Sequence, residues 1–251
     1  MPYTNFAEVV MKLDSKAFSY IDGTSFSDVF ALSIEQLDRF PERMEFVEEI
    51  VRGKTVLHIG CLDHVQLIES RIESGCYFHQ RLTNIASECL GIDINQEGIK
   101  LIQEKFHFYN MHFGDIVCAH KIPEIASKHW DYVVFGEVLE HIDNPVYFLK
   151  QFIANYKDNF DEIVITVPNA FKFVNIRRIF KNFEIINSDH RYWFTPYTIW
   201  KVVNQAGLFV DTIQMCTNGR LNNNLRKLVK DLILAQYPLL ADNIVVVCHP
   251  K

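Results

Sequence analysis

The sequence has little of what marks several large classes of protein. Its 251 residues carry 25 lysines and arginines against 31 aspartates and glutamates, a net charge of −6, whereas proteins that bind a nucleic-acid backbone usually present a basic face. No apolar run approaches the length of a membrane-spanning helix. The N-terminus also lacks the basic start and apolar stretch of a secretion signal. We therefore expect neither a nucleic-acid partner nor a membrane partner.

Paired cysteines are missing as well. The six cysteines are scattered along the chain, and none has the C-x-x-C spacing of redox and metal-binding motifs. Several sit in or beside apolar runs, where a reduced, buried thiol is the usual state. Because reduced thiols are typical of the cytosol, the pattern favours a cytoplasmic protein.

What the sequence does contain is an alternation of apolar runs and amphipathic segments. Helical patterns begin near Gln96 and cover residues 146–156 and 195–208. Such alternation is typical of an α/β fold, with a parallel sheet covered by helices on both faces. The runs that read as strands are 54–60, 88–94, 107–115, 129–137, 161–169, 208–216 and 242–250.

Turn and cap residues divide the chain further. Residues 1–50 are predicted to be an N-terminal helical extension, and residues 51–251 the main domain. A long loop is expected after the first strand, followed by a helix over 76–86 with Ser74 as its N-cap. The helix over 195–208 has Thr195 as N-cap, Pro196 at its first position and Gly207 as C-cap.

Small or acidic residues end the first four predicted strands. They are Gly60, Asp93, Asp115 and Glu137. Open α/β sheets bind ligands outside the carboxyl ends of their strands, and a carboxylate accepts two hydrogen bonds at once. One crevice with these groups suits a nucleoside with two ribose hydroxyls and an amino-acid tail. A nicotinamide enzyme is disfavoured, because the second and third glycines of G-x-G-x-x-G are absent.

Three motifs resemble those of the class I S-adenosylmethionine-dependent methyltransferases. They are GEVLEHIDNP at 136–145, ITVPN at 165–169 and DHRYWFTPYTIWKVVNQAGL at 189–208. They are similar to the bacterial group that acts on sugars, quinones and other small metabolites. The resemblance implies a single Rossmann-like, seven-stranded, mostly parallel sheet whose last strand is antiparallel. It also implies an insert after the fifth strand, at about 169–194, over the acceptor site.

The resemblance assigns S-adenosyl-L-methionine to the strand ends. Asp93 is expected to bind the ribose hydroxyls and Asp115 the adenine amino group, with the backbone N–H of Ile116 reading a ring nitrogen. One departure concerns the family's glycine loop, acidic-x-Gly-x-Gly-x-Gly, which reads HIGCLDH at 58–64 here. The expected cofactor-binding set is Gly60, Asp93, Ile94, Gly114, Asp115, Ile116, Phe135 and Gly136.

His141 and Glu137 are the predicted catalytic residues. Glu137, Glu140 and His141 are spaced i, i+3, i+4, so a helix would place them on one face. A histidine with a pKa of about 6.5 suits a general base that takes the proton of an acceptor hydroxyl. In the alternative, His141 is a packed histidine and catalysis comes from aligning the reactants.

Basic residues concentrate in the predicted insert. Lys172 and Lys181 flank Arg177 and Arg178 there, and guanidinium groups bind phosphates and carboxylates. In the alternative they solvate a helix face. The leading prediction is O-methylation of a small polar acceptor, such as a sugar or an anionic, phosphorylated metabolite, by a chain that can form a homodimer. The predicted acceptor-binding residues are Asn169, Arg177, Arg178, His190 and Arg191.

Two other functions stay open. Glu137, Glu140, His141 and His190 resemble the metal-binding set of small-RNA 2′-O-methyltransferases, in which a divalent ion activates a ribose hydroxyl. The leading prediction involves no metal, and the acidic charge of the chain counts against RNA. The second alternative is a non-catalytic scaffold that keeps the fold, suggested by the reduced glycine loop. The carboxylates at the strand ends count against it.

Overall fold

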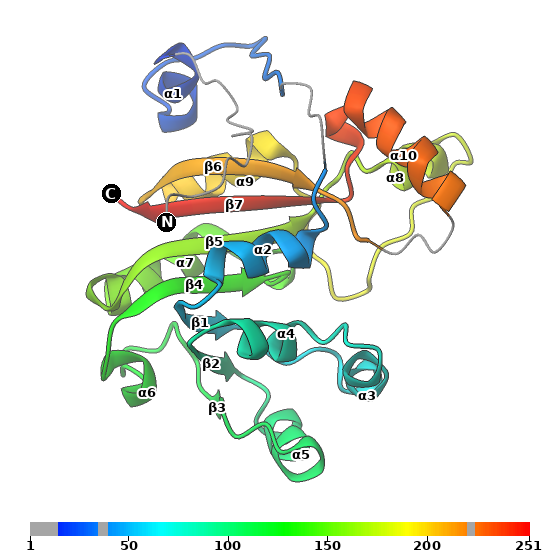
Figure 1. Ribbon diagram of the computed structural model, residues 1–251. Helices are drawn as coiled ribbons and strands as arrows, with labels where there is room; N and C mark the ends of the chain where they lie inside the picture. The colour runs from blue at the N-terminus through cyan, green and yellow to red at the C-terminus, as the bar shows by residue number, and fades with distance from the viewer. Residues whose placement is uncertain (1–14, 35–39, 220–223) are drawn as a thin grey trace.

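The computed structural model describes residues 15–34, 40–219 and 224–251 (Figure 1). A seven-stranded sheet has the order β3-β2-β1-β4-β5-β7-β6. Neighbours from β3 to β5 are parallel, and β7 lies antiparallel between β5 and β6. The predicted mostly parallel α/β sheet is therefore confirmed. The strands are β1 Thr55–Ile59, β2 Glu88–Asp93, β3 Met111–Phe113, β4 Trp130–Gly136, β5 Phe160–Pro168, β6 Leu208–Cys216 and β7 Asn243–Pro250.

Helices cover both faces of the sheet (Figure 1). On one face, Val47 of α2 and Leu82 of α4 pack against Val134 of β4. On the other face, Phe152 of α7 and Ile199 of α9 join the larger core. The helices are α1 Ser15–Asp22, α2 Arg43–Val51, α3 Val65–Glu73, α4 Phe78–Ile85, α5 Gln96–Phe106, α6 Pro123–Ala126, α7 Pro145–Tyr156, α8 Phe173–Ile179, α9 Pro196–Gln205 and α10 Asn224–Gln236.

The start of α9 follows its sequence signals. The Thr195 hydroxyl accepts a hydrogen bond from the Thr198 backbone N–H, and the Thr198 hydroxyl accepts one from the Thr195 backbone N–H, which makes a capping box. Pro196 occupies the first turn, as predicted. The C-cap is Ala206, and Gly207 follows it with a φ of 97°, so the predicted cap residue lies one position later.

The segment after β1 differs from the prediction. The expected loop contains α3, and Ser74 ends this helix rather than starting the next one. The Ser74 hydroxyl donates to the Ser70 carbonyl at 2.7 Å, which satisfies a carbonyl in the last turn of α3. The next helix, α4, has Tyr77 as its N-cap residue.

Parts of the predicted N-terminal extension lie outside the described residues, namely 1–14 and 35–39. Within the described part, the Phe18 ring of α1 meets the Trp200 ring of α9 edge-on, with centroids 5.5 Å apart. The helix α2 instead packs on the sheet. The boundary at residue 51 stays a prediction. In the described part of the chain, no helix has both the length and the apolar character needed to cross a bilayer.

Candidate functional site

The candidate site lies at the carboxyl edge of the sheet, where β1 and β4 are neighbours and the strand order reverses. Asp93 ends β2 at this edge. Its Oδ2 accepts a hydrogen bond from the Leu62 N–H at 3.0 Å, and its Oδ1 accepts one from the Asn95 N–H at 3.0 Å. Burial raises the pKa of Asp93, and these backbone N–H groups counteract the rise. Since each carboxylate oxygen can accept a second hydrogen bond, Asp93 can still bind paired hydroxyls.

Ile94 follows Asp93 and is 72% exposed, so an apolar surface lies beside the carboxylate. Asp115 is exposed near the end of β3, and its Oδ1 accepts a hydrogen bond from the Val117 N–H at 3.0 Å. Gly114 packs closely, because a Cβ there would lie 2.4 Å from Ile122 Cδ1, and the end of that side chain would have to shift. An acid and an apolar side chain therefore stand at neighbouring strand ends.

The backbone and the packing around them explain several other residues of the predicted cofactor set. Gly60 has a φ of 69°, and a Cβ there would lie 2.5 Å from Val138 Cγ2. At Gly136 a Cβ would lie 2.7 Å from the Phe78 ring. The Phe135 side chain is buried against the α7 side of the sheet, and Ile116 is buried in the same core. Direct contacts of these residues with a cofactor stay a prediction.

Sequence reasoning missed a buried polar cluster beneath the edge. His58 stands where the family's loop begins with an acid, and its Nδ1 lies 3.2 Å from the Nδ1 of His79 in α4. Burial lowers the pKa of both histidines, that of His79 to about 4, so both rings are neutral at pH 7. The Arg43 guanidinium of α2 lies 5.2 Å from the centroid of the Phe78 ring. The missing acid is thus replaced by a neutral, packed imidazole.

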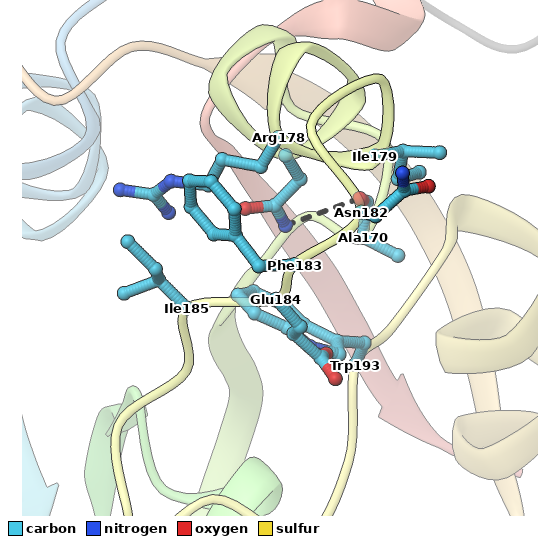
Figure 2. Close-up of a pocket in the computed structure, with 9 residues that line it drawn as sticks. Ala170, Arg178, Ile179, Asn182, Phe183, Glu184, Ile185 and Trp193 are labelled. Carbon is cyan, nitrogen blue, oxygen red and sulfur yellow. Dashed lines mark hydrogen bonds between the residues drawn. The ribbon is translucent and has the colours of Figure 1, made fainter.

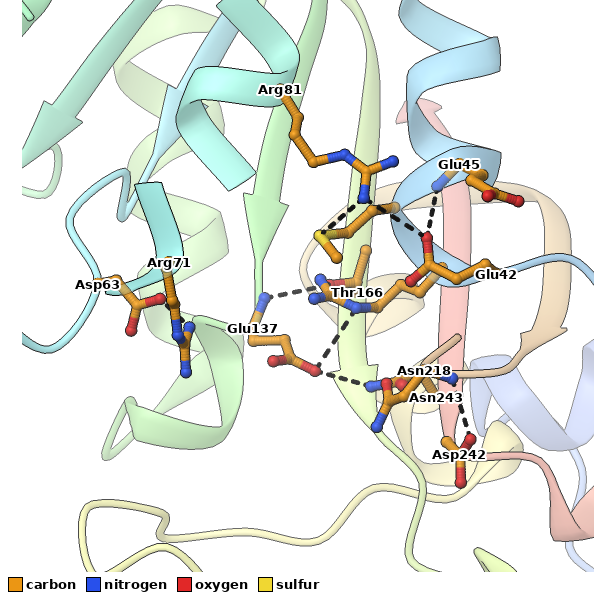
Figure 3. Close-up of polar contacts among 12 residues, drawn as sticks. Glu42, Glu45, Asp63, Arg71, Arg81, Glu137, Thr166, Asn218, Asp242 and Asn243 are labelled. Atoms are coloured by element: carbon orange, nitrogen blue, oxygen red, sulfur yellow. Dashed lines mark hydrogen bonds and ion pairs between the residues drawn. The ribbon is translucent and has the colours of Figure 1, made fainter. Parts of the chain in front are cut away.

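Glu137 does not share a helical face with Glu140 and His141, and that prediction was wrong. The residue has a φ of 58°, and only Leu139–His141 form a short 3-10 helix. Glu137 Oε1 accepts a hydrogen bond from Asn243 Nδ2 at 2.7 Å and lies 3.8 Å from Arg43 Nε. Figure 3 shows this carboxylate turned toward Asn243 of β7. The left-handed backbone therefore directs Glu137 across the sheet.

Glu140, His141 and His190 come together at the end of β4. Their ligand atoms all lie within 4.8 Å of one another. Glu140 is 0% exposed, and both of its oxygens lack a hydrogen-bond partner among the described residues. Burial, with a smaller contribution from the Glu137 charge, raises the pKa of Glu140 to about 8. The carboxyl is therefore largely protonated at neutral pH.

His141 has the arrangement of a general base. Its Nδ1 lies 3.2 Å from the Asp189 carbonyl oxygen, and because a carbonyl only accepts, Nδ1 carries the proton and Nε2 keeps its lone pair. Burial lowers the pKa of His141, so the ring is neutral at pH 7. The His190 ring meets the His141 ring edge-on, with centroids 4.7 Å apart.

Residues 187–191 form a strap across the ends of β1 and β4. Asn187 Nδ2 lies 3.3 Å from His64 Nε2 in the loop after β1. Arg191 donates from its backbone N–H to the Glu140 carbonyl at 2.7 Å and from its guanidinium to the His141 carbonyl at 2.6 Å. The same guanidinium pairs with Asp143. Arg191 thus fixes the strap onto the end of β4.

Of the other predicted acceptor residues, one is buried in the fold and two lie in or near α8. Asn169 is fully buried, donates to the Leu239 and Ala241 carbonyls at 2.7 Å, and accepts from the Phe171 N–H at 3.1 Å. This side chain holds backbone together, so we do not retain it as an acceptor-binding group. Arg178 lines a cavity beside α8, whereas Arg177 is exposed and does not line it.

Comparisons with known proteins agree with this architecture. Residues 32–213, more than half of the chain, match the family described as a methyltransferase domain. No curated protein matches the chain. Among solved structures, the small RNA methyltransferase HEN1 shares 13% identity with a TM-score of 0.53 over 88% of this chain, which spans only 27% of that protein. An S-adenosylmethionine-dependent methyltransferase from Archaeoglobus fulgidus shares 18% identity with a TM-score of 0.44, over 83% of this chain and 94% of that one. The family match, on a sheet of this order, shows that the chain belongs to the methyltransferase-domain family.

Proposed function

We propose that this methyltransferase methylates a hydroxyl oxygen of a small acceptor bound beneath the insert. The observation that carries the proposal is the state of His141. Its Nδ1 proton is bound by the Asp189 carbonyl, its Nε2 is available, and its pKa is lowered by burial. A neutral imidazole at the ligand-binding edge of the sheet is equipped to accept a hydroxyl proton.

The methyl donor is S-adenosylmethionine, and the residues of the edge fit it. The Asp93 carboxylate keeps acceptor capacity for two ribose hydroxyls, and the exposed Ile94 lies next to it for contact with a flat ring. Asp115 stands at the end of the adjacent strand. When bound, the donor supplies an electrophilic methyl group on a sulfonium.

The chain's own residues then have separable tasks. His141 Nε2 would accept the hydroxyl proton as the oxygen becomes a nucleophile. The Asp189 carbonyl holds the imidazole in the required tautomer. The strap at 187–191, fixed by Arg191, covers this end of β4 and aligns the reacting groups.

Replacing Asp93 with asparagine should weaken binding of S-adenosylhomocysteine by roughly 10- to 100-fold. A hydrogen bond to a charged group contributes about 1.5–3 kcal/mol, and each factor of ten corresponds to about 1.4 kcal/mol. Isothermal titration calorimetry measures the change. Asp131→Asn is the matched control, since this aspartate lies at the opposite edge of the sheet, bonded to Thr55. Equal affinities for Asp93→Asn and the parent would refute the ribose assignment.

The metal-dependent alternative loses one member of its ligand set. Glu137 faces Asn243, which leaves Glu140, His141 and His190 together. The leading proposal predicts that turnover of a methyl acceptor in excess EDTA equals turnover in added Mg²⁺ or Mn²⁺. The measurement is the initial rate after overnight dialysis against chelator. Loss of turnover that Mg²⁺ or Mn²⁺ restores would show that the reaction depends on a metal and would contradict the leading proposal.

The proposal also covers the binding partners of the protein and its location in the cell. An anionic small molecule is the proposed acceptor, and the chain can form a homodimer, while no nucleic-acid or membrane partner is proposed. A cytoplasmic location is proposed on the cysteines, all six of which are unpaired and four of which are buried. A catalytically inactive scaffold is not favoured, because His141 retains the contacts of a base.

A further inference from the structure

A cavity of about 550 Å³ lies between α8 and the segment that leads into the strap (Figure 2). This volume is within the range of sites that hold small molecules. Four apolar side chains dominate its wall: Ile179 of α8, Phe183, Ile185 and Trp193. Phe183 and Ile185 are 48% and 51% exposed. Exposed apolar side chains gathered around a cavity are typical of a ligand site.

The charged groups of this cavity point to an anion. The Arg178 guanidinium lines it and forms no hydrogen bond or ion pair with another described residue. The Glu184 carboxylate, in contrast, accepts a hydrogen bond from Trp193 Nε1 at 2.5 Å. Lys172 places its ammonium 4.7 Å from the centroid of the Trp193 ring. The cavity therefore combines aromatic walls with one cation that is available to a ligand.

One wall residue of the cavity, Trp193, contacts the histidine pair of the proposed site of reaction. The Trp193 ring lies 6.1 Å from the His190 ring. The His190 ring in turn lies 4.7 Å from that of His141. Ala170, which also lines the cavity, lies two residues after the end of β5 and donates its N–H to the Phe194 carbonyl at 2.7 Å. A molecule that contacts Trp193 in the cavity is thus separated from His190 by one aromatic ring.

We propose that the acceptor of this enzyme combines a planar apolar ring system with an anionic group, and that this cavity binds both. The rings lie against Phe183 and Trp193, and Arg178 binds the phosphate or carboxylate. The inference rests on the proposed function, which it narrows: a sugar phosphate would supply the anion but leave the aromatic walls uncovered.

Isothermal titration calorimetry in saturating S-adenosylhomocysteine tests this with three probes. 1-Naphthyl phosphate has rings and anion, 1-naphthol has the rings alone, and glucose 6-phosphate has the anion without an aromatic ring. The first probe should bind about tenfold more tightly than either of the others. Arg178→Gln should remove the preference for 1-naphthyl phosphate over 1-naphthol, and Phe183→Ala should weaken both naphthyl probes about tenfold. Lys181→Gln, which removes a nearby charge outside the cavity, should change neither.

Each contrary result identifies what is wrong. Equal binding of glucose 6-phosphate would overturn the ring requirement, and an unchanged preference in Arg178→Gln would overturn the anion assignment. No binding of any probe would overturn the site. Both variants alter exposed or half-exposed side chains, and circular dichroism verifies that they fold. Failure of the proposed function is distinguishable. A chain that does not use His141 as a base would still show these probe preferences, and a chain that does not bind the cofactor would give no heat from S-adenosylhomocysteine itself.

Discussion

Replacing His141 with alanine should lower kcat by roughly 10²–10⁴-fold, the usual contribution of a positioned general base. The affinity for S-adenosylhomocysteine should stay at the parent value, because the residues expected to bind the ribose and the adenine, Asp93 and Asp115, lie at the ends of β2 and β3. The kcat of the parent should also fall on the acid side of its pH profile. Since burial lowers the pKa of His141, the base stays neutral until the pH falls below its ordinary value of about 6.5. Below that lowered pKa, kcat should fall with pH as protonation removes the lone pair.

The measurement is kcat against pH for the parent, His141→Ala and a control. His129→Ala provides the control, because His129 is an exposed histidine that precedes β4 at the opposite edge and pairs with Asp161. The control should keep the parent profile. If His141→Ala retained both the parent kcat and its fall on the acid side, His141 would be a packed histidine and catalysis would depend on alignment alone.

Replacing Glu140 with glutamine should stabilise the protein at alkaline pH. The pKa of Glu140 is about 8 in the folded state, against about 4.3 when unfolded. The unfolded chain therefore releases its proton first, and this group's contribution is present below pH 4.3 and lost as pH rises through 8. The free energy of unfolding should fall by roughly 1.4 kcal/mol per pH unit within this window. Between pH 6.5 and 8 the contribution of Glu140 to the parent's free energy of unfolding should fall by roughly 2 kcal/mol, and Glu140→Gln should lose none of it.

Urea unfolding at several pH values from 6.5 to 9 measures this difference. The buried pair His58 and His79 also contributes near pH 6.5, because the unfolded chain protonates these rings there while the folded protein keeps them neutral. This contribution is common to the parent and Glu140→Gln, so the difference between their curves reports Glu140. Glu104→Gln, at an exposed position of α5, should keep the parent's dependence. Parallel curves for Glu140→Gln and the parent would show that Glu140 is ionised in the folded protein and has a partner such as a cation.

The strands could be predicted because their β-branched and aliphatic runs are long and bounded by turn residues. The predicted bounds were least accurate for the third strand, because the run over 107–115 forms a strand at Met111–Phe113 only. His107 adopts a φ of 61° and ends α5 there. The helix α3 was missed because its N-cap His64 makes no capping hydrogen bond and only Ile68 is buried along it. Weak caps and weak amphipathicity leave no clear sequence signal.

Single residues of the site could be predicted from the sequence, but the contacts between them could not. Asp93 ends β2, and His141 lies in the short 3-10 helix that follows β4; the order of apolar runs identifies both strands. The turn of Glu137 toward Asn243 joins residues 106 positions apart, and the contact of Asn187 with His64 joins residues 123 positions apart. A positive φ at a glutamate has no sequence signal. The sequence spacing therefore predicted one helical face for Glu137, Glu140 and His141, whereas the backbone turns Glu137 away from the other two.

A co-crystal structure with S-adenosylhomocysteine tests the central claim most directly. The account predicts the ribose hydroxyls on the Asp93 carboxylate, the adenine beside Ile94 and Asp115, and the sulfur facing the space bounded by His141 and the strap at 187–191. A nucleoside bound elsewhere on the chain, or a sulfur turned away from His141, would contradict it.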